Sequence, residues 1–116
     1  MKIFASDRKF VLVSFQIGHG QLLFQSGKSE FCPTRLSVLI KDARAMEIRS
    51  RSTGLSIEEV DPAVLAGRAS RPDQTLEHGH KVFLLRGEDW EGYVIGGVVL
   101  VSEDQKEFME PIDAFW

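Results

Sequence analysis

Apolar and polar residues alternate along much of this chain, and that is the period of a β-strand with one buried face. In KFVLVSFQI, residues 9–17, every second residue from Val11 to Ile17 is apolar, whereas the intervening set is half polar. The pattern predicts a strand that buries the Val11–Ile17 set. Gly18 and Gly20 then supply turn residues before QLLFQ, so we expect these two segments to form a hairpin.

The apolar residues between positions 35 and 50 fit both the period of a helix and the period of a strand. Leu36, Leu39, Ile40 and Ala43 match a helical stripe, whereas Leu36, Val38 and Ile40 match one face of a strand. The β-branched residues and the charged residues that follow favour two strands. The pattern leaves the helix open as the alternative.

The second half of the chain contains one predicted helical turn and the two strongest predicted strands. In DPAVLAG, Asp61 is suited to the N-cap, Pro62 to the first position and Gly67 to the stop. The polar segment RASRPDQTLEHG connects this turn to KVFLLR and to WEGYVIGGVVLVSED, two segments with apolar faces. We expect the polar connection to be the most flexible part of the chain.

These elements predict an all-β or β-rich fold with a minor α+β character. About seven strands and one short helix, with no repeat and no linker, indicate a single compact domain over residues 1–116, an antiparallel sandwich or barrel. Five residues on alternating apolar faces are predicted to be buried: Val13, Phe15, Leu84, Val98 and Leu100.

Charge and cysteine content narrow the classes of partner. The net charge is −3, but residues 1–58 carry +4 and residues 59–116 carry −7. An acidic surface disfavours nucleic acid and favours a protein partner with a basic surface, unless the charges serve only solubility. Cys32 is the single cysteine, and no apolar run approaches the length of a membrane span. We therefore expect a cytoplasmic protein with no membrane contact and a structural cysteine.

Two histidines in EHGHK are the candidate metal ligands. A spacing of two places His78 and His80 on one face of an extended segment. Zinc takes at least three protein ligands in most sites, and only the fold can bring His19, Glu77 or Glu88 near the pair. We predict no metal, no other cofactor and no catalytic residue.

The loop GEDWEGY, residues 87–93, is the predicted binding site. Trp90 and Tyr93 are large aromatics among carboxylates, and such residues anchor protein interfaces. The carboxylates are those of Glu88, Asp89 and Glu91. The alternative is that Trp90 packs on the rim of the core.

We therefore predict a non-enzymatic cytosolic binding module, an acidic protein-interaction, inhibitor or adaptor domain. The first alternative is a small metal-dependent β-barrel enzyme centred on His78 and His80. The second is a small-ligand carrier that uses a barrel interior. The chain has no Gly-x-Ser-x-Gly elbow and no dinucleotide-binding loop that would favour another enzyme class. The sequence leaves the partner, the oligomeric state and the strand order open.

Overall fold

The computed structural model describes residues 1–66 and 79–112, and within them the chain forms eight antiparallel strands and one 3-10 helix. The strands are β1 (Lys2–Gln16), β2 (Gln21–Ser26), β3 (Arg35–Lys41), β4 (Ala45–Glu47), β5 (Arg51–Val60), β6 (Lys81–Arg86), β7 (Glu91–Gly96) and β8 (Val98–Asp104). The helix is η1 (Pro62–Leu65). The predicted all-β, single-domain class is confirmed. No helix in these ranges is long and apolar enough to cross a membrane.

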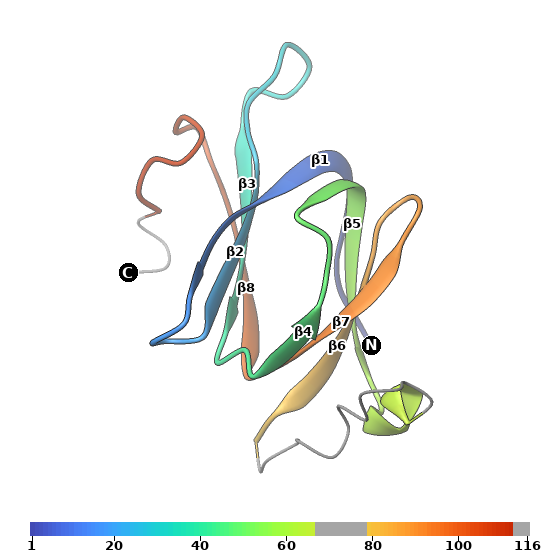
Figure 1. Cartoon of the computed structure of the whole chain (residues 1–116). Coiled ribbons are helices and arrows are strands. Elements are labelled where there is room, and N and C mark those ends of the chain that lie inside the picture. Colours follow the sequence, from blue (N-terminus) through green and yellow to red (C-terminus); the bar gives the residue numbers. More distant parts are fainter. Residues whose placement is uncertain (67–78, 113–116) are drawn as a thin grey trace.

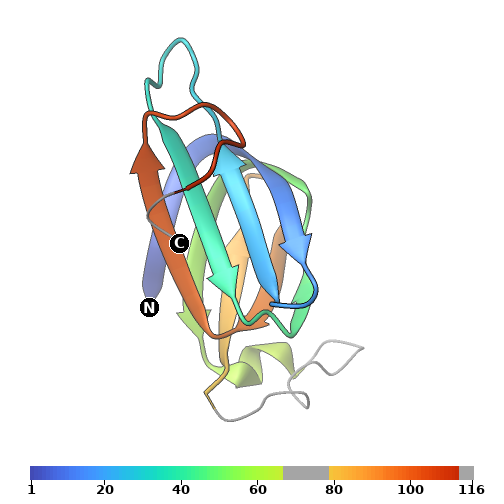
Figure 2. The ribbon, with the colours of Figure 1, turned by 90° about the vertical axis from the view of Figure 1, so that its left-hand side faces the viewer.

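The sheet folds over at β1. Its strand order is β4-β7-β6-β5-β1-β2-β3-β8. The first part of β1, Lys2–Val11, pairs with β5, whereas the second part, from Val11, pairs with β2. Two layers result, one of β8, β3, β2 and the end of β1, the other of the start of β1, β5, β6, β7 and β4 (Figures 1 and 2).

The main core fills the space between these layers. Phe10 of β1, Phe24 of β2 and Phe83 of β6 lie at its centre, and Phe4 meets Phe10 edge to face at 5.9 Å. Burial of each such side chain stabilises the fold by about 1.5–3 kcal/mol.

Two smaller clusters cover the outer faces of the layers. On one layer, Leu39 of β3 is buried together with Ile112 of the C-terminal segment. On the other, Leu65 of η1 packs with Tyr93 and Ile95 of β7. The segments that follow β5 and β8 therefore each close an apolar face that would otherwise contact water.

The strand interpretation of residues 35–50 is confirmed, because this segment forms β3 and β4. The predicted turn is also present as η1, where the Asp61 carboxylate accepts from the Ala63 amide at 2.8 Å. The predicted stop at Gly67 and the polar connection lie outside the described residues. The long segment predicted around Gly96-Gly97 is divided into β7 and β8.

The predicted core faces are only partly correct. Leu84 is buried as predicted, but on the outer face of its layer beside Tyr93, its register partner. Phe15 is 40% exposed, Val98 is 43% exposed, and Val13 and Leu100 are only partly buried. These four predictions of burial are wrong.

The face of β1 was misassigned because of a register irregularity. Leu12 lies opposite Phe24 on the core side, and the register shifts between Leu12 and Ser14. Phe10 and Leu12 belong to the alternating set that is half polar, and both lie at the main core. After the register shift, Phe15 lies opposite Leu22 and faces the core side again, but only where β1 ends. In β8, Val99 faces the main core, so Val98 and Leu100 point to the outer face.

Candidate functional site

The predicted loop between β6 and β7 is held firmly against β5. The Gly87 amide donates to the Trp90 carbonyl at 3.0 Å, and the Glu88 amide donates to the Thr53 carbonyl at 2.9 Å. The Trp90 indole Nε1 donates to Ser52 Oγ at 2.8 Å. A Cβ at position 87 would overlap the indole, so the close approach requires glycine.

Within this loop the aromatics and the carboxylates separate. Trp90 is partly buried and packs against the main core, and Tyr93 is buried in the outer cluster beneath Leu65. The three acidic residues are exposed: Glu88, Asp89 and Glu91. The structure therefore brings the predicted carboxylates together at the surface, while both predicted aromatic anchors lie inward. Their role in binding stays a prediction.

Arginines neutralise part of this acidic surface. Arg49 lies 3.5 Å from the Asp89 carboxylate, and Arg86 Nε donates to Glu91 at 2.7 Å. The hydrogen bond to Glu91 raises the pKa of Arg86. Within the described ranges, Glu88 is the loop carboxylate for which no ionic partner is present. A basic partner would have to compete with these arginines.

Ion pairs within the fold join the basic half of the chain to its acidic half. Ion pairs join Lys28 to Glu107 at 2.9 Å and Arg35 to Asp104 at 2.6 Å. Each pair connects a cation of the basic half with a carboxylate of the acidic half, as does the pair of Arg49 with Asp89. The two halves are interleaved in the layers, so the sequence asymmetry does not form two separate bodies.

Of the predicted histidine pair, only His80 lies in the described ranges. Its buried side chain places Nε2 2.9 Å from the Asp42 carboxylate, which Arg44 also contacts at 2.8 Å. The His80 hydrogen bond, then that of Arg44, lowers the pKa of Asp42. His78 and Glu77 lie outside the description. Among the residues that it covers, no three His, Cys, Asp or Glu side chains form a group suited to a metal.

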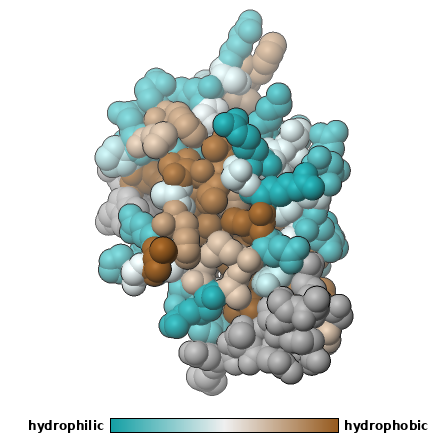
Figure 3. Space-filling model, in the orientation of Figure 1, coloured by the Kyte–Doolittle hydropathy of each residue, from teal (hydrophilic) through white to brown (hydrophobic). Residues whose placement is uncertain are grey.

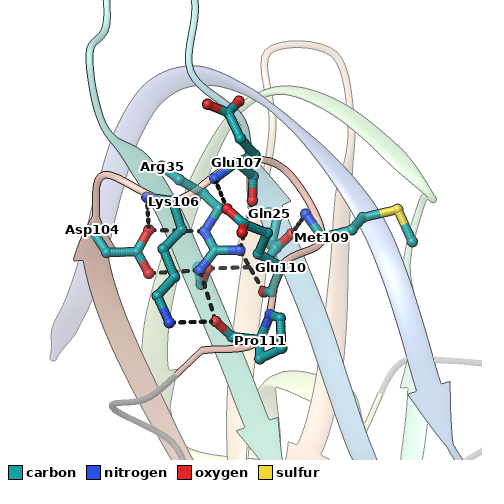
Figure 4. Close-up of polar contacts among 9 residues, drawn as sticks. Gln25, Arg35, Asp104, Lys106, Glu107, Met109, Glu110 and Pro111 are labelled. Carbon is teal, nitrogen blue, oxygen red and sulfur yellow. Dashed lines mark hydrogen bonds and ion pairs between the residues drawn. The ribbon is translucent and has the colours of Figure 1, made fainter.

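A second polar site fixes the C-terminal segment over β3 (Figure 4). Arg35 is fully buried and binds both oxygens of Asp104, at 2.9 and 2.6 Å. Its Nη1 donates to the carbonyls of Glu107 and Glu110 at 3.0 and 2.6 Å. The bidentate contact lowers the pKa of Asp104. Arg35 therefore acts as a clamp on residues 107–110.

The clamp has a neutral extension beneath the same segment. The Gln25 side chain donates to Ser37 Oγ at 3.1 Å. It also accepts from the Met109 amide at 3.1 Å (Figure 4). Both polar side chains are buried, so these bonds satisfy groups that would otherwise be costly. The network positions Met109 and, beside it, Phe108 at the surface.

The β2–β3 connection is the feature that sequence reasoning missed. Ser29 and Cys32 exchange backbone hydrogen bonds of 2.9 and 3.2 Å, which leaves Glu30 and Phe31 as a two-residue turn. This hairpin projects beyond the strands (Figures 1 and 2), and hydrophobic atoms reach its tip in the space-filling view (Figure 3). Phe31 is 87% exposed. An ordered turn thus holds a phenylalanine in water.

Further apolar side chains surround the base of this hairpin. Phe108 and Met109 are exposed, and Gly27 lies against the Phe108 ring. Phe31 and Phe108 border one surface cavity of about 590 Å³, which Cys32 also lines. We call Gly27–Thr34 with Phe108 and Met109 the hairpin end. The signal in the sequence was a phenylalanine within a polar loop, SGKSEFCPT.

Comparisons of the chain with models of protein families, with curated proteins and with solved structures found no match. The functional proposal therefore depends on the geometry of the described residues.

Proposed function

We propose that this chain is a non-enzymatic protein-interaction module that inserts Phe31 into an apolar cleft of a partner protein. One observation carries the proposal: Phe31 is 87% exposed at the tip of an ordered hairpin. Transfer of a phenylalanine side chain from water to an apolar site yields about 1.5–3 kcal/mol, so the exposed ring is a ready source of binding energy. An inhibitor or adaptor would use such a protruding residue.

The hairpin is prepared for binding before the partner arrives. The Ser29–Cys32 bridge fixes the turn, and the Phe31 amide donates to Ser29 Oγ at 3.3 Å. Since the backbone is already ordered, the partner would not have to supply the free energy for ordering a loop. This preorganisation distinguishes the hairpin from a flexible loop of similar composition.

The surroundings of Phe31 provide the rest of a contact surface. Phe108 adds a second aromatic ring beside the cavity, and Lys9 and Lys28 line the same cavity. Central apolar anchors with polar residues around them are the usual anatomy of a protein interface. We expect the partner to cover Phe31 and Phe108 together.

The loop Gly87–Tyr93 is the second surface in this proposal. Its carboxylates are exposed and its backbone is fixed, but Asp89 and Glu91 already pair with arginines. We therefore place the main contact at the hairpin end and a weaker, salt-dependent contact at Glu88.

A cytoplasmic location is part of the same proposal. Cys32 is a free, partly buried cysteine within the hairpin end. A reducing compartment would keep this thiol from forming a disulfide with another molecule. No acid–base or nucleophilic role is proposed for it.

Affinity capture with matched variants tests the proposal. Phe31→Ala removes the tip ring, whereas Val64→Ala changes a residue that is 51% exposed on η1, at the opposite end of the molecule (Figure 1). We expect the same partner with wild type and Val64→Ala, and a loss of about 30-fold in affinity with Phe31→Ala, equivalent to about 2 kcal/mol. Equal binding by all three proteins, each with an unchanged melting temperature, would contradict the proposal.

A further inference from the structure

We infer that β8 is a self-association edge, which pairs antiparallel with β8 of a second copy of this chain to form a dimer. β8 ends the strand order, and in the described part of the chain its backbone pairs with β3 alone. An edge strand presents a row of N–H and C=O groups that can pair with another strand. This surface is distinct from the hairpin end.

The apolar character of β8 sets it apart from the other edges. Its first four residues, Val98–Val101, carry no charge, and all seven residues pair with β3 without a register shift. Val98 and Val101 are each 43% exposed. A regular, apolar edge of this length is well suited to the addition of a strand.

The remaining edges have features that oppose strand addition. β4 has three residues, too few for an extended ladder. The first part of β1 is irregular, because its register with β5 shifts at Lys2/Phe4 and at Ser6/Lys9, and it carries Asp7 and Arg8. Short length, irregular register and charge are means by which proteins protect their edges. β8 lacks the first two of them, and its charges are confined to one end.

The position of these charges selects the partner and the direction. Glu103 and Asp104 lie at the end of β8, after the apolar residues. A parallel pair of β8 strands would bring four carboxylates together, whereas an antiparallel pair places them at opposite ends. A second copy supplies a strand of equal length, and an antiparallel pair obeys the twofold symmetry of most dimers.

Complete overlap fixes the register of the pair. When all seven residues of both strands face each other, Val101 lies opposite its own copy and Asp104 lies opposite Val98. The layer of β8, β3, β2 and the end of β1 then joins its copy in one sheet of eight strands across the dimer. The hairpin projects beyond the end of these strands, so the pairing leaves Phe31 accessible (Figure 2).

The oligomeric state of charged variants provides the first test. Sedimentation velocity of the wild type between about 1 and 100 µM is expected to show twice the mass of the chain. Val101→Lys places a charge at the centre of the pair, so a monomer is expected, and Val98→Lys repeats the test if the first variant does not fold. Val64→Lys, on η1, is the matched control and is expected to remain a dimer.

A cross-link tests the register. Opposed residues of an antiparallel pair have Cα atoms about 4.5–5.5 Å apart, which a disulfide can span. In a Cys32→Ser background, Val101→Cys is expected to give a covalent dimer under oxidised glutathione, and Val64→Cys is expected to give none. A monomeric wild type throughout the range, a dimer unaffected by Val101→Lys and Val98→Lys, or no selective cross-link at position 101 would overturn the inference.

Discussion

At the scale of single residues, Trp90 shows how one side chain can match two interpretations. An aromatic among acids fits both a binding anchor and a residue on the rim of the core. The hydrogen bond to Ser52 and the contact with the main core show what holds it in the unbound chain. The sequence alone does not distinguish a binding anchor from a rim residue, because Ser52 lies 38 positions away from Trp90.

Trp90→Ala is predicted to destabilise the fold by about 3 kcal/mol, because it removes a partly buried ring and leaves a cavity. Trp90→Phe keeps most of the packing and loses the bond to Ser52, so about 1 kcal/mol is expected. Urea denaturation measures both values. A loss below about 0.5 kcal/mol for Trp90→Ala, the range of surface changes, would restore Trp90 as an anchor.

The Asp42–His80 contact makes a prediction about pH. Its hydrogen bonds lower the pKa of Asp42 below the usual 3.8, so the folded chain holds this carboxylate charged more strongly than the unfolded chain. The resulting stabilisation is complete above the unfolded pKa and disappears as the pH falls through the folded pKa.

Asp42→Asn is therefore predicted to lose stability at neutral pH and to show a smaller further decline at acid pH. Asparagine also tolerates the positive φ of 57° at this position, so the backbone is preserved. Unfolding free energies measured from pH 7 to pH 2.5 make the comparison. Parallel pH profiles for the two proteins would show that the contact contributes nothing.

At the scale of the elements, β1 shows which properties of a strand the sequence specifies. The alternation of apolar and polar residues correctly predicted a strand here. The set with more apolar residues, Val11–Ile17, was taken as the buried face, and this was wrong. The register irregularity at Leu12/Ser14 and the exchange between layers depend on β2 and β5, so no local pattern reveals them. Gly96 ends β7 and Gly97 separates it from β8, an interruption that the alternating pattern does not show.

A matched pair of phenylalanines tests this assignment. Phe10→Ala is predicted to cost about 3–5 kcal/mol, because the ring is 1% exposed at the centre of the core. Phe15→Ala, in the same strand but 40% exposed, is predicted to cost about 1 kcal/mol. Chemical denaturation of both variants gives the comparison, and a larger loss for Phe15→Ala would contradict the assignment of Phe10 to the centre of the core.

The C-terminal segment depends on the Arg35 clamp. Arg35→Lys loses the bidentate contact with Asp104 and leaves carbonyl groups without a donor, so a cost of about 3 kcal/mol is predicted. Faster hydrogen exchange at the Met109 amide is expected with it. Lys28→Met breaks the exposed pair with Glu107 and is expected to change stability by less than about 1 kcal/mol. Equal effects of the two changes would argue against the clamp.

At the scale of the whole molecule, the sequence predicted the class of fold but not the arrangement of its surfaces. Period-two alternation is a local property of the sequence, so it identifies single strands. Which strands lie side by side depends on contacts between residues that are distant in the chain. The hairpin end combines Phe31 with Phe108, which are far apart in sequence. The ion pairs between the basic and the acidic half also join residues that are distant in the chain. Both features emerge only when the layers are assembled.

The most direct test of Phe31 as the residue that enters a partner protein is a photo-cross-link from the tip of the hairpin. p-Benzoylphenylalanine replaces Phe31 in one variant and Val64 in the control. Each variant is irradiated inside cells of the organism that naturally makes this protein. If Phe31 enters a cleft of a partner protein, position 31 gives one discrete adduct of that partner and position 64 gives none. No adduct from position 31, or the same products from both positions, would contradict this role of Phe31.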